Sequence, residues 1–150
     1  MTQGESGVVR PSDRAILLAF DFGLRRLGVA TANRETRTAS PLTTLRVDRE
    51  LPWTDIDRLM DDWHPAQLVV GVPEGDGAEA IARHARSFAA TLAERYGLPV
   101  ATVDETLTSA AAQSELAEGR RSGYLRRRVG RGRVDRLAAC LIAEQWMSEQ

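Results

Sequence analysis

The sequence predicts an α/β domain in which helices cover both faces of a mixed five-stranded sheet. Five short apolar runs are punctuated by turn residues, and three of them come before the first helical pattern. After these, apolar runs alternate with amphipathic segments whose apolar residues recur at helical spacing. Three strands in succession favour an antiparallel meander, and the alternation that follows favours parallel crossovers.

The first three strands are expected near the start of the chain. Residues 15–20 are continuously apolar and run into Asp21, a pattern typical of a buried central strand. Two further strands are expected at 24–31 and 36–40, because apolar and β-branched residues there flank a polar turn at 33–35.

Helices and strands alternate through the rest of the chain. Pro52 suits the start of a helix, apolar residues follow at i, i+3, i+4 and i+7, and Gly97 suits the end of a later helix. The expected elements are a helix between Pro52 and Pro65, a strand at 67–72, a helix ending near Tyr96, a strand at 100–103, a helix from Thr108 or Ser109 to Gly119, and a last helix from Val134 to Met147. The last helix should bury Leu137, Leu141, Ile142 and Trp146.

Composition limits the classes of protein that this chain can belong to. Its 150 residues fit one domain, expected at 15–150 after a disordered tail at 1–14. All 20 basic residues are arginine, and the absence of lysine excludes the P-loop lysine and Schiff-base chemistry. The single Cys140 permits no internal disulfide, and no apolar run approaches the roughly 20 residues of a membrane span. With no secretory signal visible, a cytoplasmic location is expected.

A net charge of −1 conceals two strongly charged segments. Residues 50–79 contain eight acids and one arginine, whereas 120–136 contain eight arginines and one acid. The basic segment, expected to be a loop up to residue 133, indicates an anionic partner such as nucleic acid, although a solvated loop would have the same composition. The candidate nucleic-acid-binding residues are Arg25, Arg26, Arg126, Arg127, Arg128, Arg131 and Arg133. Arg25 and Arg26 are equally compatible with exposed strand positions.

Four acids fall where a sheet of this kind would gather them. Asp21 ends the first strand, Asp104 and Glu105 end the fifth, and Asp135 lies in the first turn expected for the last helix. If the first and fifth strands are parallel neighbours, these acids converge at the carboxyl edge of the sheet, where ligands collect. Converging carboxylates repel one another unless a cation lies between them, and oxygen ligands suit Mg²⁺ or Mn²⁺. Each acid could instead be an ordinary turn, cap or helix-dipole residue.

Four ordered motifs at these positions resemble the YqgF family, also called RuvX. They are LLAFDFGLRRLGVA at 17–30, LVVGVPEGDG at 68–77, VDETLTSAAA at 103–112 and GRVDRLAACLI at 132–142. The resemblance implies an RNase H-like fold and a cytoplasmic nuclease that processes the 5′ end of the 16S rRNA precursor. The alternative that it implies is a Holliday junction resolvase acting on branched DNA. Two departures stand out: a turn at 73–77 that is one residue shorter, and arginines where the family often has lysine before Asp135.

Carried over position by position, the resemblance makes Asp21, Asp104, Glu105 and Asp135 the catalytic residues. Asp21, Glu105 and Asp135 would hold one or two Mg²⁺ or Mn²⁺ ions, with Asp104 in support, although the residues alone do not decide between Asp104 and Glu105. Structured RNA or branched DNA is the expected partner, no membrane is involved, and the protein is expected to be a monomer or a homodimer. A non-catalytic RNA-binding assembly factor is the remaining alternative.

Overall fold

A computed structural model describes residues 15–104 and 131–150, with side chains omitted at 131 and 132. The expected tail at 1–14, the helix expected near 108–119 and most of the arginine-rich segment lie outside these ranges. The strands are β1 (Ile16–Phe22), β2 (Arg26–Asn33), β3 (Thr38–Arg46), β4 (Gln67–Val72) and β5 (Val100–Asp104). The helices are α2 (Trp53–Trp63), α3 (Glu79–Tyr96) and α6 (Arg131–Ser148). No helix in this part of the chain is long and apolar enough to cross a membrane.

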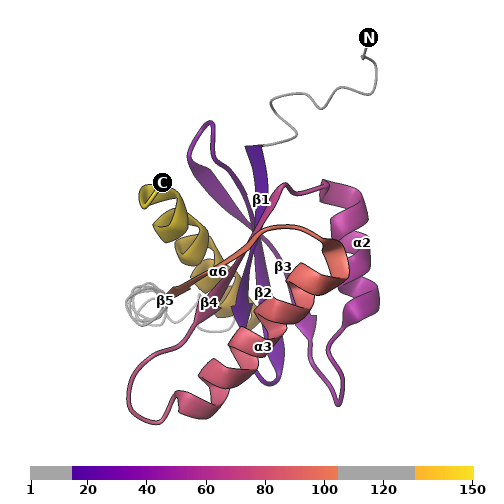
Figure 1. The fold of residues 1–150 in the computed structure, drawn as a ribbon, viewed down its shortest axis with the longest axis vertical. Helices are drawn as coiled ribbons and strands as arrows, with labels where there is room; N and C mark the ends of the chain where they lie inside the picture. Colours follow the sequence, from indigo (N-terminus) through magenta and orange to yellow (C-terminus); the bar gives the residue numbers. More distant parts are fainter. Residues whose placement is uncertain (1–14, 105–130) are drawn as a thin grey trace, which may run out of the picture.

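The five strands form one mixed sheet in the order β3-β2-β1-β4-β5, with β1 at its centre (Figure 1). The pairs β1–β2 and β2–β3 are antiparallel, whereas β1–β4 and β4–β5 are parallel. The meander followed by parallel strands is therefore confirmed. The expectation that the first and fifth strands are neighbours is wrong, because β4 lies between them. The fully buried β4 has apolar neighbours on both sides, which suits an interior position in the sheet.

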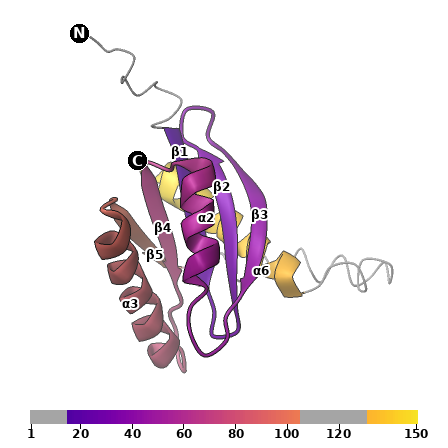
Figure 2. The same ribbon diagram turned by 90° about the vertical axis from the view of Figure 1, so that its right-hand side faces the viewer.

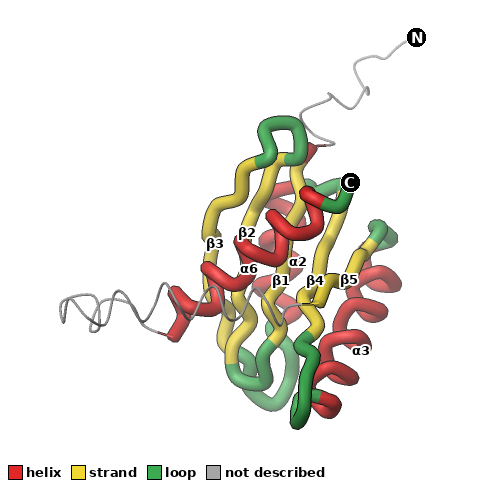
Figure 3. Tube along the Cα trace, turned by 90° about the vertical axis from the view of Figure 1, so that its left-hand side faces the viewer, coloured by secondary structure: helices red, strands yellow, loops and turns green. Residues whose placement is uncertain are grey.

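Helices α2 and α3 cover one face of the sheet and α6 crosses the other (Figures 2 and 3). Two separate apolar clusters reflect this division. Leu18 and Phe20 of β1 pack with residues of α2 and α3, whereas Leu17 and Ala19 pack with residues of α6. Because side chains alternate along a strand, this pattern shows on which face of the sheet each side chain of β1 lies.

Phe88 of α3 lies at the centre of the α2–α3 face. Its ring centroid is 5.6 Å from that of Phe20, 5.4 Å from Phe22 and 5.8 Å from Trp53. These distances are in the range of favourable aromatic pairs, so α3 is fastened to both β1 and the start of α2. The expected stripes of both helices are confirmed, with Ile56 and Met60 buried in α2 and Ala85, Phe88 and Leu92 buried in α3.

The last helix departs from its expected form in two respects. It begins at Arg131, inside the segment that composition predicts to be a loop, so the glycine at 132 does not prevent helix formation. The expected burial of Ile142 and Trp146 is confirmed, but the other two predicted core residues give way to alanines. Ala139 and Ala143 are fully buried, while Leu137 and Leu141 are only partly buried. Small side chains let this helix lie close to the sheet.

Candidate nuclease site

Asp21 lies on β1 on the side of the sheet that α6 covers. It follows Leu17 and Ala19 at alternate positions, and both of those residues pack in the cluster that includes Ile142 of α6. In the sheet register Asp21 is opposite Gly28 of β2 and Gly71 of β4. With a glycine on each side, the Asp21 carboxylate has no neighbouring side chain directly across either strand.

Gly28 brings Asp135 close to Asp21. A Cβ atom built on Gly28 would lie 2.2 Å from the backbone oxygen of Asp135 and 2.8 Å from its Cβ. Only glycine permits α6 to approach β2 this closely. Because Gly28 is the register partner of Asp21, Asp135 lies over the strand position next to Asp21, on the α6 side of the sheet. Two of the predicted acids therefore meet on one face of the sheet.

Asp135 forms an ion pair with Arg26, the first residue of β2. The Arg26 Nε atom donates to an Asp135 carboxylate oxygen at 2.7 Å, and the Asp135 side chain is only 18% exposed. Burial raises the pKa of Asp135 above its ordinary value, and the Arg26 and Arg136 guanidinium groups oppose that rise. Arg26, predicted as a possible phosphate contact, is thus engaged with an acid of the site.

The position of Asp135 within its helix differs from expectation. It is the fifth residue of α6 and not a residue of the first turn, which contains no acid. The field of the helix N-terminus falls off within the first turn, so helix-dipole compensation explains Asp135 poorly. Its contacts with Gly28 and Arg26 explain its position better.

Asp104 lies apart from this pair of acids. It is the last residue of β5, opposite Val72, and it is exposed. The preceding Val103 packs in the α6-side cluster, so alternation directs Asp104 toward the opposite side of the sheet from Asp21. Strand β4 also separates β5 from β1.

The remaining predicted residues are described only in part. Glu105, Arg126, Arg127 and Arg128 lie outside the described ranges, Arg131 is described only in its backbone, and Arg133 is exposed. Within residues 15–104 and 133–150, no group of three or more His, Cys, Asp or Glu side chains is placed to hold a metal ion. Of the predicted acids that the structure describes, Asp21 and Asp135 lie on the α6 side, and a metal site there would need a further ligand.

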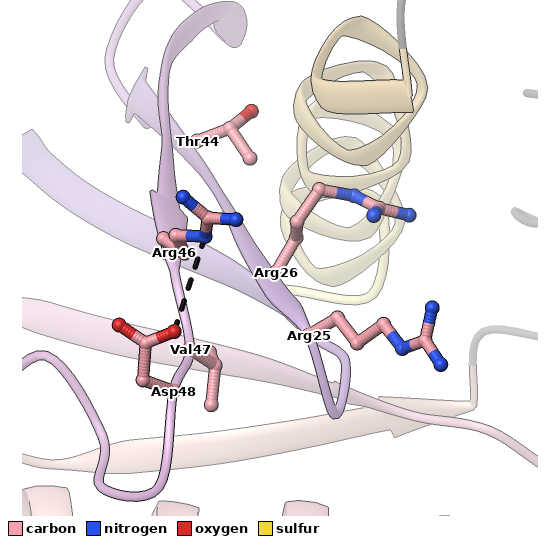
Figure 4. Close-up of a pocket in the computed structure, with 6 residues that line it drawn as sticks. All are labelled: Arg25, Arg26, Thr44, Arg46, Val47 and Asp48. Atoms are coloured by element: carbon pink, nitrogen blue, oxygen red, sulfur yellow. Dashed lines mark ion pairs between the residues drawn. The ribbon is translucent and has the colours of Figure 1, made fainter.

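A basic pocket beside Asp135 joins Arg25 and Arg26, which the sequence predicts as candidate phosphate contacts, with residues that it does not single out. It lies where β2 and β3 meet at one end of the sheet, and Figure 4 shows the side chains that line it. The lining residues are Arg25, Arg26, Thr44, Arg46, Val47 and Asp48. Arg136 of α6 reaches the same place and donates from Nη1 to Thr44 Oγ1 at 3.2 Å. Arg46 stands alone in the sequence and Arg136 ends a basic run, so neither is singled out there. The register pairs Arg46 with Arg26, and the hydrogen bond to Thr44 brings Arg136 to the same strand.

Comparison with known proteins is consistent with this geometry. Residues 15–149 match the model of a family described as RuvX, Holliday junction resolvase. A protein of Legionella pneumophila (strain Paris) named "Putative pre-16S rRNA nuclease" is 40% identical over 139 residues, covering 91% of this chain and 97% of its own. A protein of the same name from Aeromonas hydrophila subsp. hydrophila is 42% identical over 142 residues, covering 93% of this chain and 98% of its own.

Solved structures of resolvases share the fold. T. thermophilus RuvC in complex with Holliday junction substrate superposes with a TM-score of 0.52 at 14% identity, covering 91% of this chain and 95% of that one. Fowlpox virus resolvase in complex with Holliday junction DNA superposes with a TM-score of 0.55 at 10% identity, covering 89% and 97%. The predicted RNase H-like architecture is thereby confirmed.

Proposed function

The chain belongs to the RuvX family, and from that membership we propose that it is a metal-dependent endonuclease that processes the 5′ end of precursor 16S rRNA. One observation carries the proposal: Asp21 and Asp135, far apart in sequence, meet on one face of the sheet across Gly28. The names of relatives at about 40% identity over nearly their whole length support the substrate. We place the protein in the cytoplasm, where its proposed substrate is made.

The residues at this place suit a divalent cation. Two carboxylates converge there, and one of them is partly buried and already paired with a cationic group, Arg26. Hard oxygen ligands of this kind suit Mg²⁺ or Mn²⁺. When bound by Asp21, Asp135 and a third acid, one or two such ions would lower the pKa of an attacking water and stabilise charge on the phosphate.

Glu105 is our proposal for the third acid. Strand alternation directs Asp104 away from Asp21, so of the two adjacent acids Asp104 is the less suitable ligand. Glu105 itself lies outside the described residues, so this assignment rests on the orientation of Val103 and Asp104. Asp104 then has a supporting role at most.

Other residues of the chain would position the acids and bind the substrate. Arg26 would hold the Asp135 carboxylate in position, and Gly28 would fix the separation of α6 from β2. Arg25, Arg133 and the arginines at 126–128 would contact backbone phosphates, which positions a substrate without reading its sequence. Arg131 belongs to the same proposed set by its place at the start of α6.

The second candidate function is resolution of four-way DNA junctions, which the description of the matching family favours. This function would require a homodimer, because two symmetric cuts in a junction need two symmetrically placed sites. A monomer suffices for cleavage of precursor rRNA. Light scattering of the protein alone and with junction DNA distinguishes the two.

The deciding experiment is cleavage of end-labelled precursor 16S rRNA and of four-way junction DNA, each with Mg²⁺, with Mn²⁺ and with EDTA. We expect the wild type to cut only with a divalent ion, and Asp21→Asn to lose at least about a hundredfold in rate while it still binds the RNA. Asp62→Asn, an exposed acid on α2, is the matched control and should cut normally. Unchanged cleavage by Asp21→Asn would refute the assignment, and RNA binding by a wild type that never cuts would indicate a non-catalytic assembly factor.

A further inference from the structure

We infer that Arg46, Arg136 and Thr44 form a phosphate-binding site for a backbone phosphate that flanks the cleaved one. This inference rests on the proposed function and adds a site to it. The ligand is a phosphodiester group of an RNA or DNA strand that runs from Asp21 and Asp135 toward the β3 edge of the sheet.

The sheet register places this site in line with the acids. Asp21, Gly28 and Thr44 are direct partners across β1, β2 and β3, and Arg26 and Arg46 are partners in the same alternation. Directly paired residues project on the same side of a sheet, so this set shares the α6 side with Asp21. Two strand spacings separate Asp21 from Thr44, a distance of about 10 Å. Because Asp135 of α6 lies over Gly28, a nucleic acid strand would reach Thr44 past Arg25 and Arg26, which line the pocket with it.

The side chains have the chemistry that a phosphate needs. Arg136 donates one hydrogen bond to Thr44 Oγ1, and a guanidinium group has five N–H donors in all. The Arg46 side chain is 87% exposed, and its ion pair with Asp48 spans 3.9 Å, so Asp48 restrains it only weakly. Guanidinium forks match phosphate oxygens in a bidentate manner, which makes two of them beside a hydroxyl a suitable cradle.

The local charge also favours an anion. Figure 4 shows the guanidinium of Arg46 near Thr44 and that of Arg25 extending from the β1–β2 turn. Four arginines (Arg25, Arg26, Arg46 and Arg136) gather here against two acids, Asp48 and Asp135. The excess positive charge adjoins the carboxylates on which the proposed cleavage depends, as substrate binding across both would require.

Binding without catalysis tests the site. In EDTA, the affinity of the full chain for a hairpin RNA and for a four-way DNA junction is measured by fluorescence anisotropy at several salt concentrations. We expect Arg46→Gln and Arg136→Gln each to weaken binding by about tenfold and to reduce the slope of log K against log salt by roughly 0.7–0.9. Arg86→Gln, which removes the same charge from the exposed side of α3, should change neither quantity. Thermal unfolding of each variant separates lost contacts from lost structure.

A double-substitution cycle between the protein and the nucleic acid then identifies the phosphate that Arg46 contacts. Neutral methylphosphonates are placed one at a time along the hairpin strand. We expect a methylphosphonate at one position to weaken binding by the wild type. The same methylphosphonate should cause no further loss of affinity in Arg46→Gln, because the contact between that arginine and that phosphate is already absent there. If Arg46→Gln and Arg136→Gln bind as Arg86→Gln does, the inference is wrong while the nuclease proposal stands. If wild type binds with these effects but never cleaves, the site stands and the nuclease proposal falls.

Discussion

Gly28 is the residue on which the approach of the two acids depends. A Cβ there would overlap the backbone of Asp135, and backbone atoms cannot rotate away as a flexible side chain can. We expect Gly28→Ala to displace the start of α6 and to lower the free energy of unfolding by about 3 kcal/mol, with loss of cleavage. Urea unfolding measures the stability change.

Gly97→Ala is the control for that substitution. Gly97 has a positive φ of 65° but open space around its Cβ position, so alanine there should cost only about 1 kcal/mol through backbone strain. Equal losses at the two positions would show that α6 does not need its close contact with β2.

Arg26 and Asp135 form the second pair that can be tested at this scale. With the Asp135 side chain 18% exposed, removal of Arg26 leaves a partly buried carboxylate without its partner. We expect Arg26→Gln to lower the free energy of unfolding by about 1–2 kcal/mol at neutral pH in EDTA. The loss should be much smaller in the Asp135→Asn background, and a double-mutant cycle from urea unfolding measures the difference. Additive losses would show that the pair is not coupled.

At the scale of elements, α2 and α3 are joined by a polar cluster on their outer surface. Arg95 donates to Asp57 at 2.8 Å and stacks over Trp53 at 4.9 Å, and the Tyr96 hydroxyl donates to Asp57. Arg95 holds the pKa of Asp57 below its usual value through a hydrogen bond. Burial, followed by the hydrogen bond to Asp57, raises the pKa of Tyr96 from 10.0 to about 12.

This cluster gives the fold a pH dependence at the alkaline end. A raised pKa in the folded state means that the unfolded chain loses its proton first as the pH rises. We expect the stabilisation to be complete below pH 10 and to fall by about 1–2 kcal/mol as the pH rises through the folded-state value of about 12. Urea unfolding at a series of pH values measures the decrease, and Tyr96→Phe should remove most of it. A wild type and a Tyr96→Phe variant with the same alkaline profile would contradict the prediction.

Some helices and strands of this fold are predictable from the sequence and others are not. Apolar periodicity and the Pro52 and Gly97 signals locate α2, β4 and α3 well, because the spacing of apolar residues and the residues that begin or end a helix are local features of the sequence. The start of α6 is not predicted, since its glycines and arginines have no apolar period. The helix packs on β2 and β3, and this packing is a non-local contribution that the sequence does not display. The order of strands is a non-local property, so the position of β4 between β1 and β5 could not be read from spacing.

For the site, the sequence predicts the acids better than their partners. Asp21 and Asp135 stand out as acids at the ends of expected elements. The role of Gly28 depends on a helix more than 100 residues away in the chain, and the engagement of Arg26 with Asp135 depends on the same packing. A glycine inside an otherwise apolar strand is nevertheless a signal of close backbone approach, and it was present in the sequence.

For the molecule as a whole, the net charge of −1 conceals an uneven distribution of charge over the two faces of the described part of the chain. The acids of α2, including Asp61 and Asp62, are exposed on the side of the sheet opposite to α6. The described arginines of the basic pocket lie on the α6 side with Asp135. A polyanion is therefore attracted to the face that bears the proposed site and repelled from the other.

A divalent ion that binds the folded molecule at Asp21 and Asp135 should stabilise the whole domain, whether or not a substrate is present. Binding at a hundredfold excess over Kd contributes about 2.7 kcal/mol, which for a chain of this length raises Tm by about 5–10 °C. We expect Mn²⁺ to raise the Tm of the wild type in a scanning calorimeter, and EDTA to reverse the rise. The shift should vanish in Asp21→Asn and in Glu105→Gln, and it should persist in Asp104→Asn, since Asp104 faces the other side of the sheet. A shift that persists in Glu105→Gln and vanishes in Asp104→Asn would mean that the acids at the end of β5 have exchanged roles. A shift that persists in Asp21→Asn would mean that the ion binds elsewhere.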